Sequence, residues 1–218
     1  MIDLHTHTLL SDGALTLAEH IRRAEVAGYR FLGISDHADF ANLPVILPQV
    51  LTAAAWENKL RRVAVLAGVE LTHVRPEQIA DAAALARQLG ADYVIVHGET
   101  VAEPVVEGTN RAAIAAGADI LAHPGLITLA DAQLAAEKGV LLEISGKGGH
   151  CLTNGHVAQT ARQTGAALIF GSDAHTPEQM PRRAYAEKIM RGAGLTTEEI
   201  FAAFANAQRF AERKLQGR

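Results

Sequence analysis

Short runs of apolar residues recur along the chain and alternate with longer, alanine-rich stretches. The apolar runs have the length of β-strands, and the stretches between them have the length of amphipathic helices. We expect strands at residues 2–5, 31–35, 63–70, 93–97, 120–123, 140–144 and 167–171. We expect helices at residues 17–27, 48–62, 76–89, 109–116, 129–138 and 155–164, and a last helix from Thr197 onward. This alternation predicts a parallel sheet covered by helices.

A glycine follows five of the helical stretches, just before or close to the next apolar run. These glycines are Gly28, Gly90, Gly117, Gly139 and Gly165. Glycine readily takes the left-handed conformation that ends a helix, so their recurrence supports a series of β/α units. Seven units predict an α/β fold of the TIM-barrel type, a (β/α)7 barrel with one unit fewer than the usual eight. A doubly wound open sheet is the alternative architecture.

Residues 1–218 contain no linker, low-complexity tract or charged tail, so we expect one domain. The longest irregular stretch, residues 38–47, is a candidate lid. The net charge of −4 makes long nucleic acids unfavourable partners, and one cysteine allows no intrachain disulfide. No signal peptide or membrane-spanning run is visible, which predicts a cytoplasmic protein that does not bind membranes.

Six of the seven predicted strands end in histidine, aspartate or glutamate. In parallel α/β folds the functional groups lie at the carboxyl ends of the strands, so these side chains should meet on one face. In chain order they are His5, His7 and Asp12; Asp36 and His37; Glu70; His97 and Glu99; His123; and Asp173 and His175.

The pairs His5-x-His7 and Asp173-x-His175 suggest a metal site. Residues two positions apart on an extended chain point to the same side and can bind one ion together. Imidazole and carboxylate ligands without thiolates suit Zn, Mn or Fe. His20, by contrast, falls inside a predicted helix and is expected to face solvent. His73 and His150 fall in predicted loops, and His156 falls where a loop meets the helix expected from residue 155.

The series of motifs resembles the PHP family, named for polymerase and histidinol phosphatase. HTHTLLSDG (residues 5–13), SDH (35–37), GVE (68–70), AHP (122–124) and SDAH (172–175) are similar to its successive motifs. The resemblance extends from His5 to His175. It implies a distorted barrel of seven β/α units that holds two to three divalent metals.

The resemblance also implies a set of nine ligands. His5, His7, Glu70 and Asp173 would hold one metal, and Asp12, His37 and His175 a second. His97 and His123 would hold a third, with Glu70 bridging it to the first. Asp12 stands where some relatives carry histidine, so the resemblance does not fix the metal that the second site prefers.

The activity expected from this resemblance is hydrolysis of a phosphate ester by attack of a metal-bound hydroxide. Three divalent cations bring six positive charges and the ligand carboxylates remove three, which suits a phosphate dianion. Asp173, His175, Glu99 and His150 are the candidate catalytic residues. The candidates for binding phosphate are Lys147, which lies in the glycine-rich segment SGKGGH, and the arginines Arg111, Arg182 and Arg183. Glu143 either supports a ligand or holds Lys147.

The expected substrate is a small phosphorylated molecule, such as histidinol phosphate or another phosphomonoester, or a nucleotide. Two other functions fit part of the pattern. A metal-dependent amidohydrolase or deaminase also begins with His-x-His and ends with aspartate, but it usually has eight strands and a carboxylated lysine. A non-catalytic, metal-binding regulatory domain would not need the complete ligand series.

Overall fold

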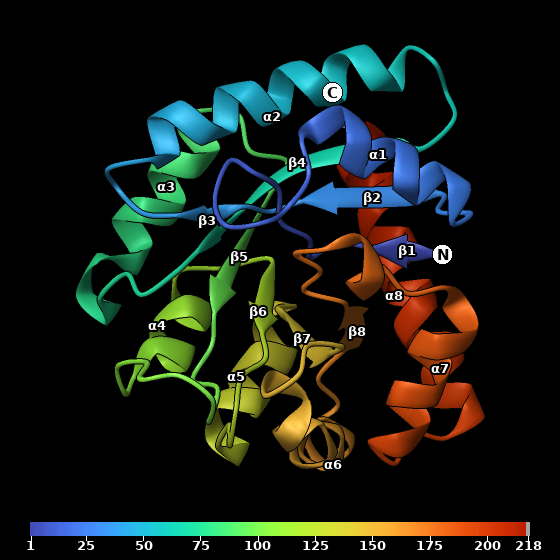
Figure 1. The fold of residues 1–218 in the computed structure, drawn as a ribbon. Helices are drawn as coiled ribbons and strands as arrows, with labels where there is room; N and C mark the ends of the chain where they lie inside the picture. The colour runs from blue at the N-terminus through green and yellow to red at the C-terminus, as the bar shows by residue number, and fades with distance from the viewer. Residues whose placement is uncertain (217–218) are drawn as a thin grey trace.

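The computed structural model describes residues 1–216, which form a parallel sheet surrounded by helices (Figure 1). The strands are β1 (Ile2–Asp3), β2 (Phe31–Ile34), β3 (His37–Ala38), β4 (Ala64–Leu71), β5 (Tyr93–His97), β6 (Ile120–Ala122), β7 (Leu141–Ser145) and β8 (Leu168–Gly171). The helices are α1 (Leu17–Val26), α2 (Leu43–Asn58), α3 (Ile79–Gln88), α4 (Thr109–Ala115), α5 (Leu129–Lys138), α6 (Asn154–Thr164), α7 (Arg183–Gly192) and α8 (Thr197–Gln216). Three single turns of 3-10 helix add η1 (Pro76–Gln78), η2 (His150–Thr153) and η3 (Pro177–Gln179).

The sheet runs in the order β1-β2-β4-β5-β6-β7-β8, with β3 paired to the end of β4, and all of these pairs are parallel. The segments that follow β1 and β8 then meet. Thr6 forms a bridge with Ala174, and the Asp173 amide donates to the His5 carbonyl at 2.9 Å. The sheet is thereby nearly closed, which confirms the TIM-barrel-like prediction over the open sheet.

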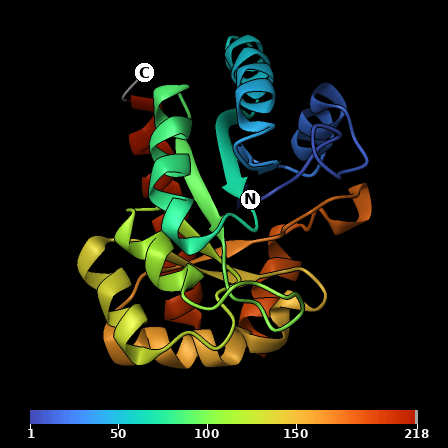
Figure 2. The same ribbon diagram turned by 90° about the vertical axis from the view of Figure 1, so that its left-hand side faces the viewer.

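Large apolar and aromatic side chains fill the interior of the barrel near the amino ends of the strands. Tyr93 is buried there, donates its hydroxyl to the Leu4 carbonyl at 2.7 Å and packs edge-on against Phe210 of α8. A side chain at Gly33 or Gly68 would collide with the Tyr93 ring, so these two glycines make room for it. Turning the molecule by 90° shows the loops that follow the strands on one side and the end of α8 on the other (Figure 2). Apolar side chains such as Tyr93 and Phe210 therefore fill one end of the barrel interior, which leaves the other end for polar groups.

Two helices differ from the sequence-based expectation. Helix α2 begins at Leu43, five residues earlier than expected, so the predicted irregular stretch of residues 38–47 is wrong for most of its length. Pro44 lies in the first turn, where no backbone N–H is needed, and Pro48 lies inside the helix although proline there removes a hydrogen bond. Helix α7 was not expected; its buried residues Ala186 and Met190, four positions apart, are a short signal within a highly charged segment. Within residues 1–216, no helix is both long and apolar enough to cross a lipid bilayer.

The expectation that His20 faces solvent is wrong. His20 lies in α1 as predicted, but its side chain is buried and its Nε2 lies 2.9 Å from the Thr6 hydroxyl. That hydroxyl donates to the Gly33 carbonyl, so it accepts the proton of His20 Nε2. Helix α1 thus fixes the backbone between His5 and His7. The error arose because a polar residue on a helix was assigned to the solvent-facing side without regard to a partner.

Burial lowers the pKa of His20 to about 4. In the unfolded chain this histidine takes up a proton below about pH 6.5, whereas in the folded chain it does so only near pH 4. Protonation therefore favours the unfolded chain, and the free energy of unfolding falls as the pH falls from 6.5 toward 4. Between pH 7.5 and pH 5 we expect His20 to reduce the free energy of unfolding by about 2 kcal/mol. Urea unfolding of wild type and His20→Gln at both pH values measures this component. An equal loss in both proteins would show that His20 does not carry it.

Candidate metal centre

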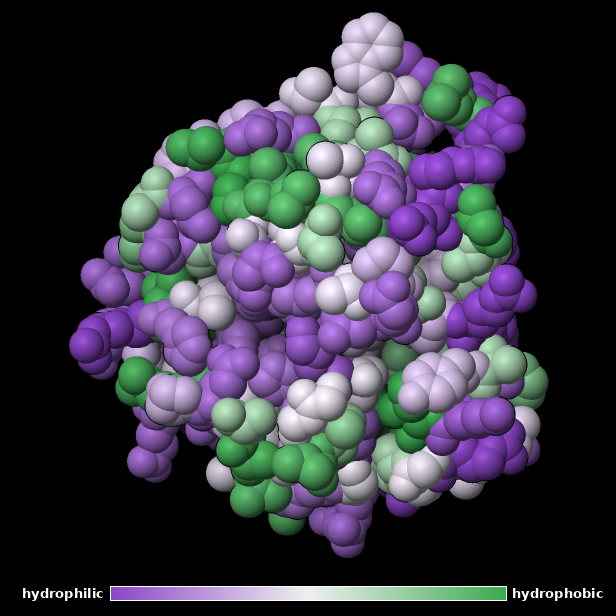
Figure 3. All heavy atoms as spheres, viewed as in Figure 1, coloured by the Kyte–Doolittle hydropathy of each residue, from purple (hydrophilic) through white to green (hydrophobic). Residues whose placement is uncertain are grey.

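The carboxyl ends of the strands open onto the face seen in Figure 1, and hydrophilic residues surround a hollow in the middle of that face (Figure 3). Within residues 1–216, five groups of histidine and carboxylate side chains have ligand atoms within 4.8 Å of one another. All nine residues predicted as ligands belong to these groups. The groups are His5, His7 and Glu70; His5, His123 and Asp173; His7, Asp12, His37 and His175; His97, His123 and His150; and His73, His97 and Glu103.

The two innermost groups surround Glu70 and Asp173, both of which are buried. Glu70 Oε1 lies 3.4 Å from His5 Nε2 and equally 3.4 Å from Nε2 of His123. Asp173 Oδ1 lies 3.2 Å from His7 Nε2. Glu70 comes from β4 and Asp173 from the segment after β8, so the two carboxylates approach the histidines from different strands. Glu70 in particular lies between His5 and His123.

The third group lies nearer to solvent. Asp12 Oδ1 lies 3.1 Å from His175 Nε2 and 3.6 Å from His37 Nε2, and more than half of the Asp12 side chain is exposed. Asp36 holds the loop that carries Asp12, because its carboxylate accepts hydrogen bonds from the amide and hydroxyl of Thr8 and from the hydroxyl of Ser11. Asp36 therefore positions this loop instead of joining the group.

The fourth and fifth groups share His97, the last residue of β5. The imidazole ring of His123 lies 4.4 Å from that of His97 and stacks 4.1 Å from that of His150, between ring centroids. His73, His123 and Asp173 have positive φ angles, which residues other than glycine adopt at a cost. Of the four described non-glycine residues with a positive φ, three therefore belong to the five groups and the fourth, Arg61, lies outside them.

Several buried ligand atoms lack a hydrogen-bond partner among the described residues. They are His5 Nε2, both ring nitrogens of His7, Glu70 Oε1, His123 Nδ1 and Asp173 Oδ1. A buried polar atom without a partner destabilises a protein by about 1–3 kcal/mol. Divalent cations would supply partners to these atoms, so the residues present fit a metal cluster.

A second layer of hydrogen bonds orients the histidines toward this cluster. His5 Nδ1 lies 2.5 Å from Glu143 Oε2, and His97 Nδ1 donates to the Gly98 carbonyl at 3.1 Å. A partner that accepts at Nδ1 keeps the proton there and leaves the Nε2 lone pair for a metal. Of the two roles considered for Glu143, the structure therefore supports the one in which it orients a ligand.

The charges in the cluster are strongly coupled. Burial by itself would lower the pKa of His5, but the carboxylates of Glu143, Glu70 and Asp173 raise it well above its ordinary value. Burial would raise the pKa of Glu70, whereas His5 and neighbouring histidines hold it well below the usual range. The pKa of Asp173 is also lowered, mainly by His5 and His7 against the effect of burial. Asp173 is thus unsuited to hold a proton at neutral pH.

The structure brings some of the other candidate residues to the cluster. Lys147 Nζ lies 2.6 Å from His175 Nδ1 and 3.7 Å from Asp173 Oδ1. His150 stacks on His123, and burial lowers its pKa to about 4, so the His150 ring is neutral at pH 7.

Four other candidates are engaged elsewhere or lie in another hollow. Glu99 accepts the backbone N–H of Asn110 at the start of α4. Arg111 pairs with Asp131, Arg183 pairs with Glu187, and Arg182 borders a separate hollow beside Arg22 and Arg23.

Three residues of the groups, His73, Glu103 and His150, were not predicted as ligands, although His150 is one of the candidate catalytic residues. Glu103 follows β5 in a loop, and His73 follows β4. The loop after β5 carries two glutamates in succession, Glu99 and Glu103. Their positions in the sequence do not show that Glu103 contacts the histidines and Glu99 does not. The positive φ of His73 also leaves no trace in the sequence, because such a conformation is usually signalled by glycine.

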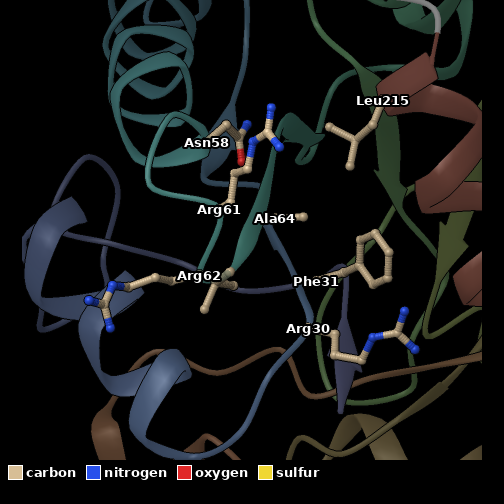
Figure 4. Close-up of a pocket in the computed structure, with 8 residues that line it drawn as sticks. Arg30, Phe31, Asn58, Arg61, Arg62, Ala64 and Leu215 are labelled. Atoms are coloured by element: carbon tan, nitrogen blue, oxygen red, sulfur yellow. The ribbon is translucent and has the colours of Figure 1, made fainter.

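A pocket of about 470 Å³ lies at the amino ends of β2 and β4 (Figure 4). Phe31 and Ala64, the first residues of β2 and β4, line it together with Arg30, Arg61 and Leu215. None of its lining residues belongs to the five groups. In barrels of this kind the amino-terminal face serves stability, and the chemistry lies at the carboxyl ends of the strands. We therefore place the functional site at the histidine cluster.

Comparison with known proteins agrees with the strand-end motifs. Residues 3–144 match the PHP domain. The chain belongs to the PHP family. An uncharacterized protein of Methanocaldococcus jannaschii is 43% identical over 204 residues, which cover 91% of this chain and 92% of that PHP relative. A probable phosphatase of Pectobacterium carotovorum subsp. carotovorum is 28% identical over 222 residues, which cover 91% and 88% of the two chains.

Solved structures similar in fold to this PHP chain include the histidinol phosphate phosphatase of Lactococcus lactis subsp. lactis, crystallised with zinc, L-histidinol and phosphate. The TM-score is 0.60 at 16% identity, and the match covers 89% of this chain and 94% of that one. At this level of identity the likeness bears on the fold, which agrees with the nearly closed barrel.

Proposed function

We propose that the chain hydrolyses the phosphate ester of a small molecule at a cluster of two to three divalent metals, Zn, Mn or Fe. The observation that carries this proposal is the set of buried ligand atoms without hydrogen-bond partners at the carboxyl ends of the strands. Membership of the PHP family and the relative named a probable phosphatase support hydrolysis of phosphate esters as the reaction class. The zinc, L-histidinol and phosphate in the structure from Lactococcus lactis support metals and a small substrate.

We assign the ligands in three sites. His5, His7, Glu70 and Asp173 would hold the first metal; Asp12, His37 and His175 the second; and His97 and His123 the third, with Glu70 between the first and third. Donor atoms around one tetrahedral ion lie about 3.3 Å apart when the bonds are roughly 2.0–2.1 Å. The contacts of Glu70 with His5 and of Asp12 with His175 are close to this spacing. Bound divalent metals lower the pKa of coordinated water and stabilise the charge that develops on a phosphate group.

Lys147 is assigned to the substrate phosphate. It lies on the segment after β7, whose glycines at 146, 148 and 149 have no side chains to cover the backbone. The Lys147 ammonium group lies against His175 and Asp173. An ammonium group beside the cluster can hold a phosphate oxygen as a point charge. Glu99, Arg111 and Arg183 have other partners and are left out of the assignment.

Lys147→Ala is expected to raise KM for a phosphomonoester by roughly 10-fold, because one charge-assisted hydrogen bond to the phosphate is lost. Steady-state phosphate release at saturating metal measures the change. Lys188→Ala is the matched control, since Lys188 is an exposed lysine of α7. Unchanged KM and kcat in Lys147→Ala would remove this residue from the substrate site.

The substrate is tested by measuring phosphate release from a panel of histidinol phosphate, other small phosphomonoesters, nucleotides and short oligonucleotides. We expect turnover of at least one small phosphorylated compound at neutral pH in the presence of Zn, Mn or Fe. Hydrolysis of amides or deamination of bases by the same preparation, without phosphate release, would instead favour the amidohydrolase alternative.

A further inference from the structure

Glu103 and His150 lie against the histidines of the third proposed site, although the nine-residue ligand series includes neither of them. Glu103 comes from the loop after β5, and His150 is the first residue of η2. His150 is buried, and Glu103 is partly exposed.

Glu103 contacts the histidines with both of its oxygens. Its Oε2 lies 3.1 Å from His97 Nε2, and its Oε1 lies 3.5 Å from His150 Nε2. These spacings bracket the roughly 3.3 Å that separates the donors of one tetrahedral ion. His150 also stacks on His123, and ligand atoms of His97, His123 and His150 lie within 4.8 Å of one another. The three imidazoles can therefore surround one ion, and Glu103 lies against two of them, His97 through Oε2 and His150 through Oε1.

The hydrogen bonds leave the required nitrogens free. His97 Nδ1 donates to the Gly98 carbonyl, so Nε2 carries its one available lone pair. His150 Nδ1 lies 2.8 Å from the Thr100 hydroxyl, which leaves Nε2 toward Glu103 and Asp173. This is the arrangement of a metal-binding histidine held by a second layer.

His73 is the competing partner of His97 and Glu103. Its Nε2 lies 3.3 Å from Glu103 Oε2, and nearly half of its side chain is exposed. Because His97 has one free lone pair, it can coordinate one metal, either with His73 or with His123 and His150. The second group is buried throughout, where unpaired ligand atoms are most destabilising. We therefore favour the buried group.

We propose that the third metal of this chain is bound by His97, His123, His150 and Glu103, a set of three imidazoles and one carboxylate. This inference rests on the proposed metal cluster and adds two ligands to it. Such a ligand set suits Zn or Fe, and it disfavours Mg and Ca, which prefer oxygen ligands. Together with Glu70, which we assign between the first and third metals, this set would give the third metal five ligands.

The test is binding of Zn²⁺ alone to chelator-treated protein, followed by titration calorimetry and by elemental analysis after gel filtration. Wild type is expected to bind three equivalents. Glu103→Gln and His150→Ala are each expected to bind two equivalents of Zn²⁺ normally and the third roughly 100-fold more weakly or worse. Loss of a residue that only orients a ligand typically weakens metal binding by about 10–100-fold, so a larger loss indicates a direct ligand. Glu107→Gln, an exposed glutamate of the same loop, is the matched control and is expected to behave as wild type.

A second readout keeps the test independent of folding defects. Co²⁺ bound to the wild type is expected to give visible absorption bands for each site, and the bands of the third equivalent should be missing in Glu103→Gln. Since Glu103 is partly exposed, this variant should fold even if His150→Ala does not. Wild-type affinity for all equivalents in both Glu103→Gln and His150→Ala would overturn the inference. So would loss of the third equivalent in His73→Ala but not in His150→Ala.

Failure of this inference is distinguishable from failure of the proposed function. If wild type binds only two equivalents and releases phosphate, the assignment of the third metal is wrong and the hydrolase proposal stands on the other two sites. If wild type binds no Zn²⁺ at all, both are wrong.

Discussion

Glu70→Gln is expected to weaken two metal sites at once and to lower kcat/KM for a phosphomonoester by roughly 10³-fold or more. Glu70 Oε1 lies 3.4 Å from Nε2 of both His5 and His123, which belong to different sites in our assignment. Its other oxygen lies 2.7 Å from His37 Nδ1. An amide keeps the shape of the side chain but loses the charge, so it cannot neutralise two cations. Removal of charge stabilisation of this kind typically slows catalysis by orders of magnitude.

The measurement is metal content by elemental analysis together with steady-state kinetics. Glu143→Gln is the matched comparison, because Glu143 is also a buried glutamate but contacts only the far nitrogen of His5. It is expected to reduce the affinity of one site by about 10–100-fold. Loss of a single metal equivalent in Glu70→Gln would contradict its position between two sites.

Removing the metals is expected to lower the free energy of unfolding by several kcal/mol. A ligand that binds only the folded chain stabilises it by about 4 kcal/mol when its free concentration is roughly 1,000 times its dissociation constant. In this chain the buried nitrogens of His7 and oxygens of Glu70 and Asp173 would also be left without partners. Urea unfolding with Zn²⁺ and with a chelator measures the difference.

The same experiment on Glu70→Gln provides the control. Its unfolding midpoint should depend much less on Zn²⁺ than that of the wild type, because two of its sites are weakened. Identical midpoints for the wild type with metal and with chelator would mean that the histidine cluster does not bind metal tightly in the folded state.

The barrel could be predicted from the sequence because its strands are buried on both faces. Strands such as β4 and β5 therefore appear as apolar runs, and turn glycines such as Gly139 and Gly165, which take positive φ angles, separate the units. The start of α2 was misplaced because prolines at positions 44 and 48 suggested a break. Helix α7 was missed because only two of its residues are buried, too few to dominate a charged segment.

The metal-type residues could be predicted where they end a strand or belong to one of the motifs, as Asp12 does in HTHTLLSDG. The end of a strand fixes both the place and the direction of a side chain, as it does for Glu70 and His97. Glu103 and His73 lie in loops outside the motifs, where direction depends on the fold of the loop. The burial of His20 could not be predicted because its partner, Thr6, is brought to it by packing of α1 on the barrel.

The metal centre and its proposed reaction are tested most directly by elemental analysis of the purified protein, followed by a phosphate-release assay on the same sample with and without a chelator. We expect two to three equivalents of Zn, Mn or Fe per chain and phosphate release that the chelator abolishes and added metal restores. Bound metal without release of phosphate from any substrate would contradict the proposed reaction. The absence of bound metal after loading with each of the three would contradict the metal centre itself.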